Sequence, residues 1–261
     1  MNKVIEVQKE NGYAIVTINK PPVNALGEQV ASELLDAFTL IENDGEVRSV
    51  ILTGAGDKFF MAGADIKEFP SWLGNPEMIN QVKFNHQLFN KIEKLRKPTI
   101  ALLNGLTLGG GCELALSCDF RIAEKHSKIG FPEIDLGIFP GGGGTQRLPK
   151  LVGKSKAKEL MFFGESISAE EALSIGLVNK VVDSGAGLEV AKQWATKLAS
   201  KSSNAINLIK NTIDYGYEHT FTEGIEYETE LFCNVFQHQD AFEGIHAFIE
   251  KRKPVFNQSI K

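Results

Sequence analysis

The chain has 261 residues and a formal net charge of -5, with 28 Lys and Arg against 33 Asp and Glu. This acidic balance argues against a dedicated nucleic-acid binder and against a polybasic membrane-surface protein. Hydrophobic residues make up 43% and charged residues 23%, as in globular proteins that bury a core without disulfide or metal support. The length is that of one or two domains.

The cysteines and the N-terminal stretch indicate a cytoplasmic protein. Three cysteines are an odd number, and no two are spaced C-x-x-C, so a reducing compartment is the simpler interpretation. The first residues, MNKVIEVQKENGYA, contain no apolar signal core and are neither Arg-rich nor Ser-rich. No stretch approaches the 18 apolar residues of a membrane span. We therefore expect no membrane partner.

The first two-thirds of the chain alternates strand and helix patterns. A β-branched run predicts a strand at 13–18, and the spacing of Val30, Leu34, Phe38 and Ile41 predicts one helix face. Further strands are expected at 47–53 and 99–103, with a helix between them that starts at Pro76 and stops before Pro98. Strands separated by helices favour an α/β fold with a sheet covered by helices.

The pattern changes near residue 153. Ser168 with Glu171 forms a capping box, and the helix that it starts is expected to end at Gly176. A short strand is possible at 178–182, and from Gly187 onward only helical periodicity remains. Breaks are expected at 202–203, Gly216 and 237–240, a cap at Asp240 with Glu243, cations Lys251 to Lys253 at a helix C-terminus, and a stop at Pro254.

The segment 98–118 contains one charged side chain, Glu113, in 21 residues. A lone buried carboxylate near a helix N-terminus is a candidate for acid–base chemistry, and the alternative is an exposed or capping Glu. Three glycines, 109–111, precede it. They can leave helix N–H groups free for an anion or a developing oxyanion, or they can be an ordinary flexible loop.

A second acidic site follows 20 residues later, where Glu133 is set among apolar side chains. Two carboxylates facing one cleft can share acid and base roles. Asp135 is a rival candidate on the same grounds, and a solvated loop residue is the alternative. Lys58 and Lys67, which flank an Ala-Gly-Ala turn, can hold phosphates or be plain surface lysines.

Several cofactor and nucleophile motifs are missing from the sequence. Leu114 and Arg147 occupy the last glycine position of the two possible G-x-G-x-x-G patterns. There is no G-x-S-x-G or H-E-x-x-H, and the five histidines form no metal-spacing cluster with the cysteines. We expect no metal and no bound redox cofactor.

Long ordered stretches of the chain resemble the enoyl-CoA hydratase/isomerase family, the crotonase superfamily. The resemblance is carried by FFMAGADIKEF (59–69), PTIALLNGLTLGGGCELALSCDFRIA (98–123) and IGFPEIDLGIFPGGGGTQRLPKLVG (129–153), and NKPPVNAL (19–26) and FIEKRKPVF (248–256) also fit. It implies a spiral of ββα units over residues 1–195 and a helical C-terminal trimerisation region over 196–261. It also implies homotrimers or dimers of trimers that bind acyl-CoA thioesters, with no cofactor beyond coenzyme A itself. The net charge of -5 argues against a nucleic-acid partner.

The resemblance assigns roles residue by residue. The oxyanion hole is expected at the N–H groups of Ala64 and Gly110, where preorganised donors stabilise the charge on a thioester oxygen. Glu113 and Glu133 match the two acids of the family's hydratases, with Glu133 giving a proton to C2 and Glu113 activating water. Substrate contacts are expected at Ala62, Asp65, Ile66, Lys67, Lys58 and Gly141. Lys251 either reaches a neighbouring subunit's ligand or serves as a helix C-terminal cation.

Both acids together favour an enoyl-CoA hydratase of fatty-acid or related acyl-CoA breakdown, a carbon–oxygen lyase. A Δ3-Δ2-enoyl-CoA isomerase is the first alternative, because the same carboxylates can move a proton without water. A weak CoA-binding or scaffold member is the second. Leu106-Thr107 stands where hydratases often carry Tyr-Ala, which bears on substrate preference, and acyl chain length is expected to depend on residues 69–78 and the C-terminal helices.

Overall fold

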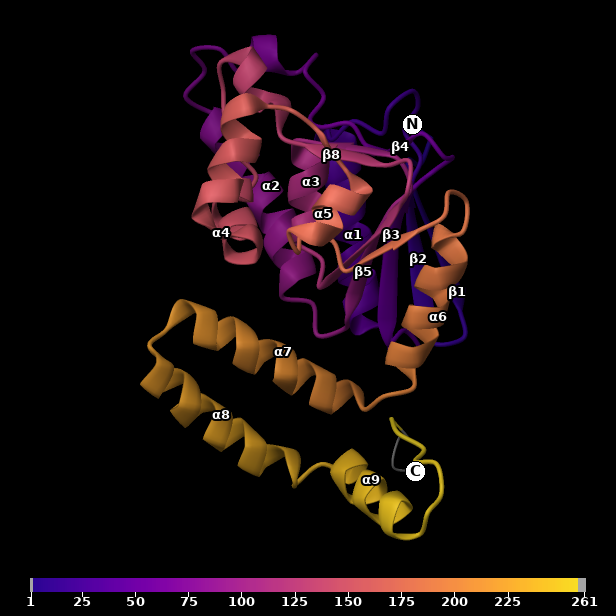
Figure 1. The fold of residues 1–261 in the computed structure, drawn as a ribbon. Coiled ribbons are helices and arrows are strands. Elements are labelled where there is room, and N and C mark those ends of the chain that lie inside the picture. Colours follow the sequence, from indigo (N-terminus) through magenta and orange to yellow (C-terminus); the bar gives the residue numbers. More distant parts are fainter. Residues whose placement is uncertain (1, 258–261) are drawn as a thin grey trace.

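The computed structural model describes residues 2–257, whose strands form two sheets (Figure 1). The larger sheet has the spatial order β1 (Ile5–Glu10), β2 (Tyr13–Ile18), β3 (Ser49–Gly54), β5 (Thr99–Leu103), β7 (Phe120–Glu124) and β10 (Lys180–Val182). The smaller sheet has the order β4 (Phe59–Met61), β6 (Leu106–Leu108), β8 (Lys128–Gly130) and β9 (Ile167–Ser168). Neighbouring strands are parallel except β1 with β2 and β8 with β9.

Helices separate the strands in a regular repeat. They are α1 (Glu28–Asn43), α2 (Met78–Glu93), α3 (Gly110–Leu116), α4 (Gly144–Phe163), α5 (Ala169–Ser174), α6 (Gly187–Ala199), α7 (Ser203–Glu218), α8 (Phe221–Val235) and α9 (Gln239–Ile249), with short 3-10 turns η1 (Phe69–Ser71) and η2 (Pro132–Leu136). Three successive units, β3-β4-α2, β5-β6-α3 and β7-β8-α4, each add one strand to each sheet and then a helix. This alternation is the spiral of ββα units expected from the sequence.

The larger sheet is covered on both faces, which explains why its strands are apolar throughout. Successive residues of a strand point to opposite faces. Ile51 and Ile100 therefore join the cluster that packs under Ala191 and Ala195 of α6. On the opposite face Val50, Leu52, Ala101 and Leu103 belong to the main core. That core also contains the buried face of α1, formed by Val30, Leu34, Phe38 and Ile41 as the periodicity predicts.

Two helix signals in the C-terminal third were interpreted wrongly from sequence. The predicted break at Gly216 does not occur, because α7 continues through it to Glu218. The chain turns after Glu218 instead, and Thr220 and Glu223 form a complete capping box at the start of α8. The N-cap of α9 is His238, and Asp240 lies in its first turn. Local polar side chains at Thr220 and His238 outweigh the glycine signal, since one helical glycine costs only about 1 kcal/mol.

The C-terminal helices lie to one side of the body (Figure 1). Helices α7 and α8 pack against each other, and Lys210 of α7 pairs with Asp119 Oδ1 of the body at 2.9 Å. Neither α7 nor α8 contains a buried residue. The expected boundary after residue 195 falls inside α6, so the division into two domains stays a prediction. Among the described helices, none is long and apolar enough to cross a membrane.

Gly111 tests how tightly α3 packs on the smaller sheet. A Cβ at this position would lie 2.2 Å from the backbone oxygen of Met61 at the end of β4. We expect Gly111→Ala to lower the free energy of unfolding by about 1–3 kcal/mol or more, because the backbone must move to accept the methyl group. Gly45→Ala is the control, since its Cβ would meet nothing within 4 Å. Denaturant unfolding checks both, and equal stability of the two variants would contradict the packing described.

Candidate active site

Three segments meet where parallel strands of the smaller sheet end. The chain runs from β4 into residues 62–64, from β6 into Gly109 and α3, and from β8 into η2. Because β4, β6 and β8 are parallel neighbours, their carboxyl ends lie at one edge, where open α/β sheets commonly bind ligands. A hydrogen bond of 2.9 Å from Gly109 N to Gly130 O ties two of the segments together.

Two backbone N–H groups lie side by side at this edge. Leu26 forms a parallel bridge with Ala64. Its two hydrogen bonds run from Leu26 N to Gly63 O and from Asp65 N to Leu26 O, on either side of Ala64. The N–H of Ala64 therefore faces away from Leu26. Gly110 is the first residue of α3, so its N–H has no partner within the helix. A Cβ on Gly110 would lie 3.5 Å from Ala64 N, which makes the pair suitable for one oxygen with developing negative charge.

Glu113 follows one turn later on α3 and is only 4% exposed. Its Oε1 accepts hydrogen bonds from Gly142 N at 2.7 Å and Gly144 N at 2.8 Å. Burial raises the pKa of this carboxyl group, and the two N–H groups and the nearby Arg147 charge oppose the rise. Both donors converge on one oxygen, so Oε2 takes no hydrogen bond from the part of the chain that is described.

Glu133 lies on η2 against the start of α3. A Cβ at Gly109 would lie 2.5 Å from its Oε1, and Gly109 adopts a φ of 49°, so both space and backbone conformation require glycine there. Within residues 2–257 its buried Oε2 has no hydrogen-bond partner. Burial, with a smaller contribution from the Glu113 charge, raises its pKa to about 7. Such a group can give or take a proton near neutral pH.

The rival acid and the rim residues lie elsewhere. Asp135 is exposed and faces Gly164 at the end of α4, where a Cβ would lie 3.4 Å from its Oδ2. Lys58, Ile66 and Lys67 are exposed on the segments before and after the Ala-Gly-Ala turn.

Two of the other residues predicted to contact substrate already use their backbone N–H groups in hydrogen bonds within the protein. The N–H groups of Ala62 and Asp65 donate to Val23 O and Leu26 O, so a ligand on this stretch would find carbonyl oxygens and side chains. Gly141 is exposed at the start of residues 141–144, which we call the glycine loop, and Lys251 is exposed just after α9 with a φ of 55°. The substrate contacts of all these residues stay predictions.

The sequence reasoning missed the residues that hold Glu113. It singled out Gly141, whereas Gly142 and Gly144 make the hydrogen bonds to the carboxylate. Arg147 and Phe89 were also missed. Phe89 packs against the loop so closely that its Cε2 would lie 2.6 Å from a Cβ on Gly142. The available signal was a run of four glycines ahead of a helix, which supplies free N–H groups without indicating the oxygen they face.

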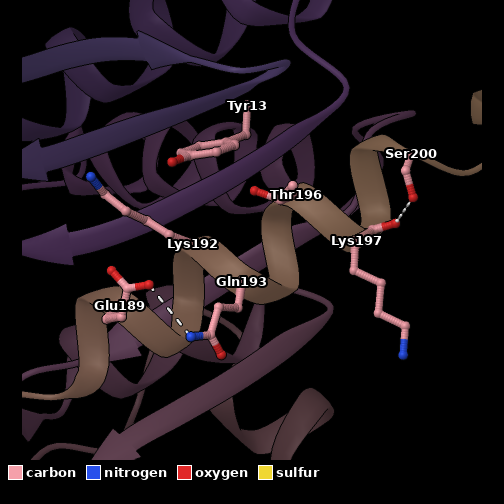
Figure 2. Close-up of a pocket in the computed structure, with 7 residues that line it drawn as sticks. All are labelled: Tyr13, Glu189, Lys192, Gln193, Thr196, Lys197 and Ser200. Carbon is pink, nitrogen blue, oxygen red and sulfur yellow. Dashed lines mark hydrogen bonds between the residues drawn. The ribbon is translucent and has the colours of Figure 1, made fainter.

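The hollow in Figure 2 is separate from this site. It runs along α6 and is lined by Tyr13, Glu189, Lys192, Gln193, Thr196, Lys197 and Ser200. Lys192 already pairs with Glu10 at 3.0 Å, and Gln193 bonds to Glu189 on its own helix. Over residues 2–257, no group of three or more His, Cys, Asp or Glu side chains is placed to hold a metal ion.

Comparison with known proteins assigns the family. The family model described as enoyl-CoA hydratase/isomerase matches residues 8–259. A short-chain-enoyl-CoA hydratase of Clostridium acetobutylicum is 46% identical, covering 97% of each chain, and a crotonyl-CoA hydratase of Syntrophomonas wolfei is 44% identical, also covering 97% of each. The crystal structure of an enoyl-CoA hydratase from Bacillus anthracis superposes with a TM-score of 0.93 at 39% identity, covering 98% of this chain and 100% of that one.

The chain therefore belongs to the enoyl-CoA hydratase/isomerase family, and the predicted α/β crotonase fold is confirmed.

The raised pKa of Glu133 predicts a stability effect that depends on pH. The pKa of about 7 in the folded protein exceeds the ordinary glutamate value of 4.5. Between these pH values the folded protein therefore binds more protons at Glu133 than the unfolded chain does, and its stability falls as pH rises. We expect Glu133→Gln to raise the unfolding temperature clearly at pH 8 and little at pH 5. At pH 8 the expected gain in the free energy of unfolding is on the order of 2 kcal/mol, after allowance for the partial exposure of the Glu133 side chain.

Thermal unfolding at the two pH values measures this difference, with Asp135→Asn as the matched control on the same turn. Asp135 is exposed, so its variant is expected to follow the wild type at both pH values. A Glu133→Gln variant with the same unfolding-temperature difference at pH 5 and pH 8 would contradict the raised pKa.

Proposed function

We propose that this protein is an enoyl-CoA hydratase, a carbon–oxygen lyase that converts a trans-2-enoyl-CoA to a 3-hydroxyacyl-CoA. The observation that carries the proposal is the placement of two carboxylates, Glu113 and Glu133, beside the paired N–H groups of Ala64 and Gly110. The hydratases of Clostridium and Syntrophomonas, at 46% and 44% identity, support the same chemistry. We place the activity in the breakdown of fatty acids or related acyl groups.

The thioester oxygen is proposed to sit between the N–H groups of Ala64 and Gly110. Negative charge develops there when water adds to C3, and preorganised donors stabilise it at no reorganisation cost. Glu113 accepts a proton from the water as its oxygen bonds to C3, and Glu133 gives its proton to C2. The cycle closes when the proton on Glu113 is returned to Glu133 through solvent.

The division of roles follows from the surroundings of each acid. Glu133 keeps a proton near neutrality because burial raises its pKa to about 7 and its Oε2 is without a donor. Burial raises the pKa of Glu113 too, but there two N–H groups and the Arg147 charge oppose the rise and favour the ionised form. The alternative isomerase would use the same acids to move a proton from C4 to C2, with no water.

The coenzyme A part of the substrate is proposed to lie along residues 62–67. Lys58 and Lys67 are exposed cations there, suited to the phosphate groups. Residues 69–78 would limit the depth of the acyl pocket. No cofactor beyond the substrate's coenzyme A is invoked. We place the protein in the cytoplasm, in keeping with the unpaired thiols of Cys112, Cys118 and Cys233.

Crotonyl-CoA tests the reaction through loss of its enoyl-thioester absorbance. We expect fast turnover by the wild type and a reduction of about 10²–10⁴ in kcat for both Glu113→Gln and Glu133→Gln, because each removes one proton-transfer group. Asp135→Asn is again the control and is expected to keep the wild-type rate.

The other outcomes separate the alternatives. Formation of a conjugated thioester from 3-enoyl-CoA, without hydration of crotonyl-CoA, would replace the hydratase by the isomerase. Binding of crotonyl-CoA with neither reaction would indicate the CoA-binding or scaffold role.

We also propose that the C-terminal helices assemble copies of this chain into a homotrimer, or into a dimer of trimers. Large hydrophobic side chains are exposed along all three helices, among them Ile209, Ile213, Phe221, Phe232, Phe236, Phe242 and Phe248. Phe221 and Phe248 are 83% and 85% exposed. Exposed apolar side chains gathered in this number mark a protein interface, and neither α7 nor α8 contains a buried residue.

Charge placed on this surface tests the assembly. We expect Ile213→Glu combined with Phe232→Glu to lower the mass in solution from that of a trimer or hexamer to that of a monomer, because two carboxylates would be buried without partners. Light scattering coupled to size-exclusion chromatography measures the mass. Leu40→Glu, on the exposed side of α1, is the control and is expected to leave it unchanged. A monomeric wild type would contradict the proposal.

A further inference from the structure

Arg147 is the cation that holds the glycine loop beside Glu113. It lies in the first turns of α4, and its side chain is 12% exposed. Nη1 donates to the backbone oxygen of Gly142 at 3.2 Å. A Cβ at Gly143 would lie 2.2 Å from Nη1, and Gly143 has a φ of 100°. The glycine therefore serves the close approach of the guanidinium as well as the backbone turn.

The guanidinium is itself held by helix α2. Nε and Nη2 donate to the two oxygens of Glu93 at 3.1 and 2.6 Å, a two-pronged pair. Nη2 also donates to Asn90 Oδ1 at 2.8 Å. Four donor contacts in a rigid plane fix the position of Arg147 in a way that a lysine amine does not reproduce.

Gly142 is thus held from both sides. Its carbonyl oxygen accepts from Arg147, and its N–H donates to Glu113 Oε1. Gly144, which donates the second hydrogen bond to the same oxygen, lies between Gly143 and Arg147 in the chain. The path from α2 through Arg147 to the glycine loop therefore ends at the carboxylate of Glu113.

We propose that Arg147 is a positioning residue for Glu113, which it aligns through the Gly142 carbonyl and whose ionised form its charge favours. The proposal rests on the role given to Glu113 under the proposed function. Arg147 touches neither of the proposed reacting groups. Its effect on Glu113 is therefore transmitted through the glycine loop and through the electrostatic field of its positive charge.

The charges around Glu113 make the field argument specific. Burial raises the pKa of Glu113, and the N–H groups of the glycine loop and the charge of Arg147 on α4 oppose that rise. Glu133 on η2 is the other carboxyl group that faces it, and Cys112 on α3 has a thiol whose pKa burial keeps well above its usual range. From α2, Glu93 neutralises part of the Arg147 charge, and His86 lies near Gly143.

Arg147→Gln and Glu93→Gln form a matched pair, because both weaken the same contact between α2 and α4 and they remove opposite charges. We expect Arg147→Gln to lower kcat for crotonyl-CoA about 10–100-fold with KM within about threefold of wild type, as for a small misplacement of a catalytic group. Its acid limb in the pH profile of kcat/KM should move to higher pH, because Glu113 without the nearby cation holds its proton more tightly.

Glu93→Gln should leave that limb in place or move it to lower pH, since the cation remains and loses its neutralising partner. Arg147→Lys should keep the acid limb near its wild-type position, because the positive charge remains. Its kcat should fall, because the lysine amine cannot make the two-pronged pair with Glu93 and the bond to Gly142 O together. Lys156→Gln, in the part of α4 beyond its kink at Gly153 and in ion pairs with Glu159 and Glu171, is the control for loss of a charged pair away from the glycine loop and is expected to leave both kcat and the limb unchanged.

The outcomes separate this proposal from the proposed function. If Arg147→Gln and Glu93→Gln move the limb in the same direction, or Arg147→Gln keeps the wild-type kcat while Glu113→Gln is inactive, the positioning role is overturned and the hydratase stands. If Glu113→Gln keeps full activity, the proposed function of that acid is overturned first. If Arg147→Gln does not fold, Arg147→Lys and Glu93→Gln still test the positioning role. The role then requires that Arg147→Lys lowers kcat without moving the acid limb to higher pH.

Discussion

The site depends on one buried carboxylate that two backbone N–H groups satisfy. Transfer of an ionised Glu113 from water into the core costs several kcal/mol unless hydrogen bonds replace its hydration. Gly142 and Gly144 supply those bonds from a segment about thirty residues along the chain. Their glycines are then obligatory for space as well, because a Cβ at Gly142 would lie 2.6 Å from Glu113 Oε2. The carboxylate therefore accounts for Gly142 and Gly144, whereas Gly143 makes room for the Arg147 guanidinium.

The smaller sheet brings these distant pieces together. Its three parallel strands, β4, β6 and β8, are short, and each is followed at once by a segment of the proposed site. The N–H of Ala64, the start of α3 and Glu133 are thereby placed at one edge without any long loop. Close packing underneath fixes their separation, as the contact of Gly111 with Met61 O and the 2.9 Å bond between Gly109 and Gly130 show. Preorganised donors of this kind are what oxyanion stabilisation requires.

Much of this arrangement could be predicted from the sequence, and the missing part has a physical reason. Buried strands such as 13–18 and 99–103 and the face of α1 are local patterns, and the structure confirms them. The lone charge of Glu113 in an apolar segment signalled its burial correctly. The partners of that charge could not be predicted, because the contacts of Gly142 and Arg147 join segments far apart in the chain. Gly216 misled for a different, local reason, since one helical glycine costs little and the capping box of Thr220 with Glu223 sets the boundary between α7 and α8.

The two acids differ in their hydrogen-bond partners, although both are buried near the same helix and burial raises the pKa of both. Glu133 has an oxygen with no donor among the described residues, so its neutral form is favoured and its pKa rises to about 7. Glu113 meets two N–H groups and the field of Arg147, which hold back the effect of burial. Environments that push two pKa values apart separate an acid from a base. The glycine loop and Arg147 therefore do more than close the core: they supply the difference in hydrogen bonding and charge on which the proposed division of roles between the two side chains rests.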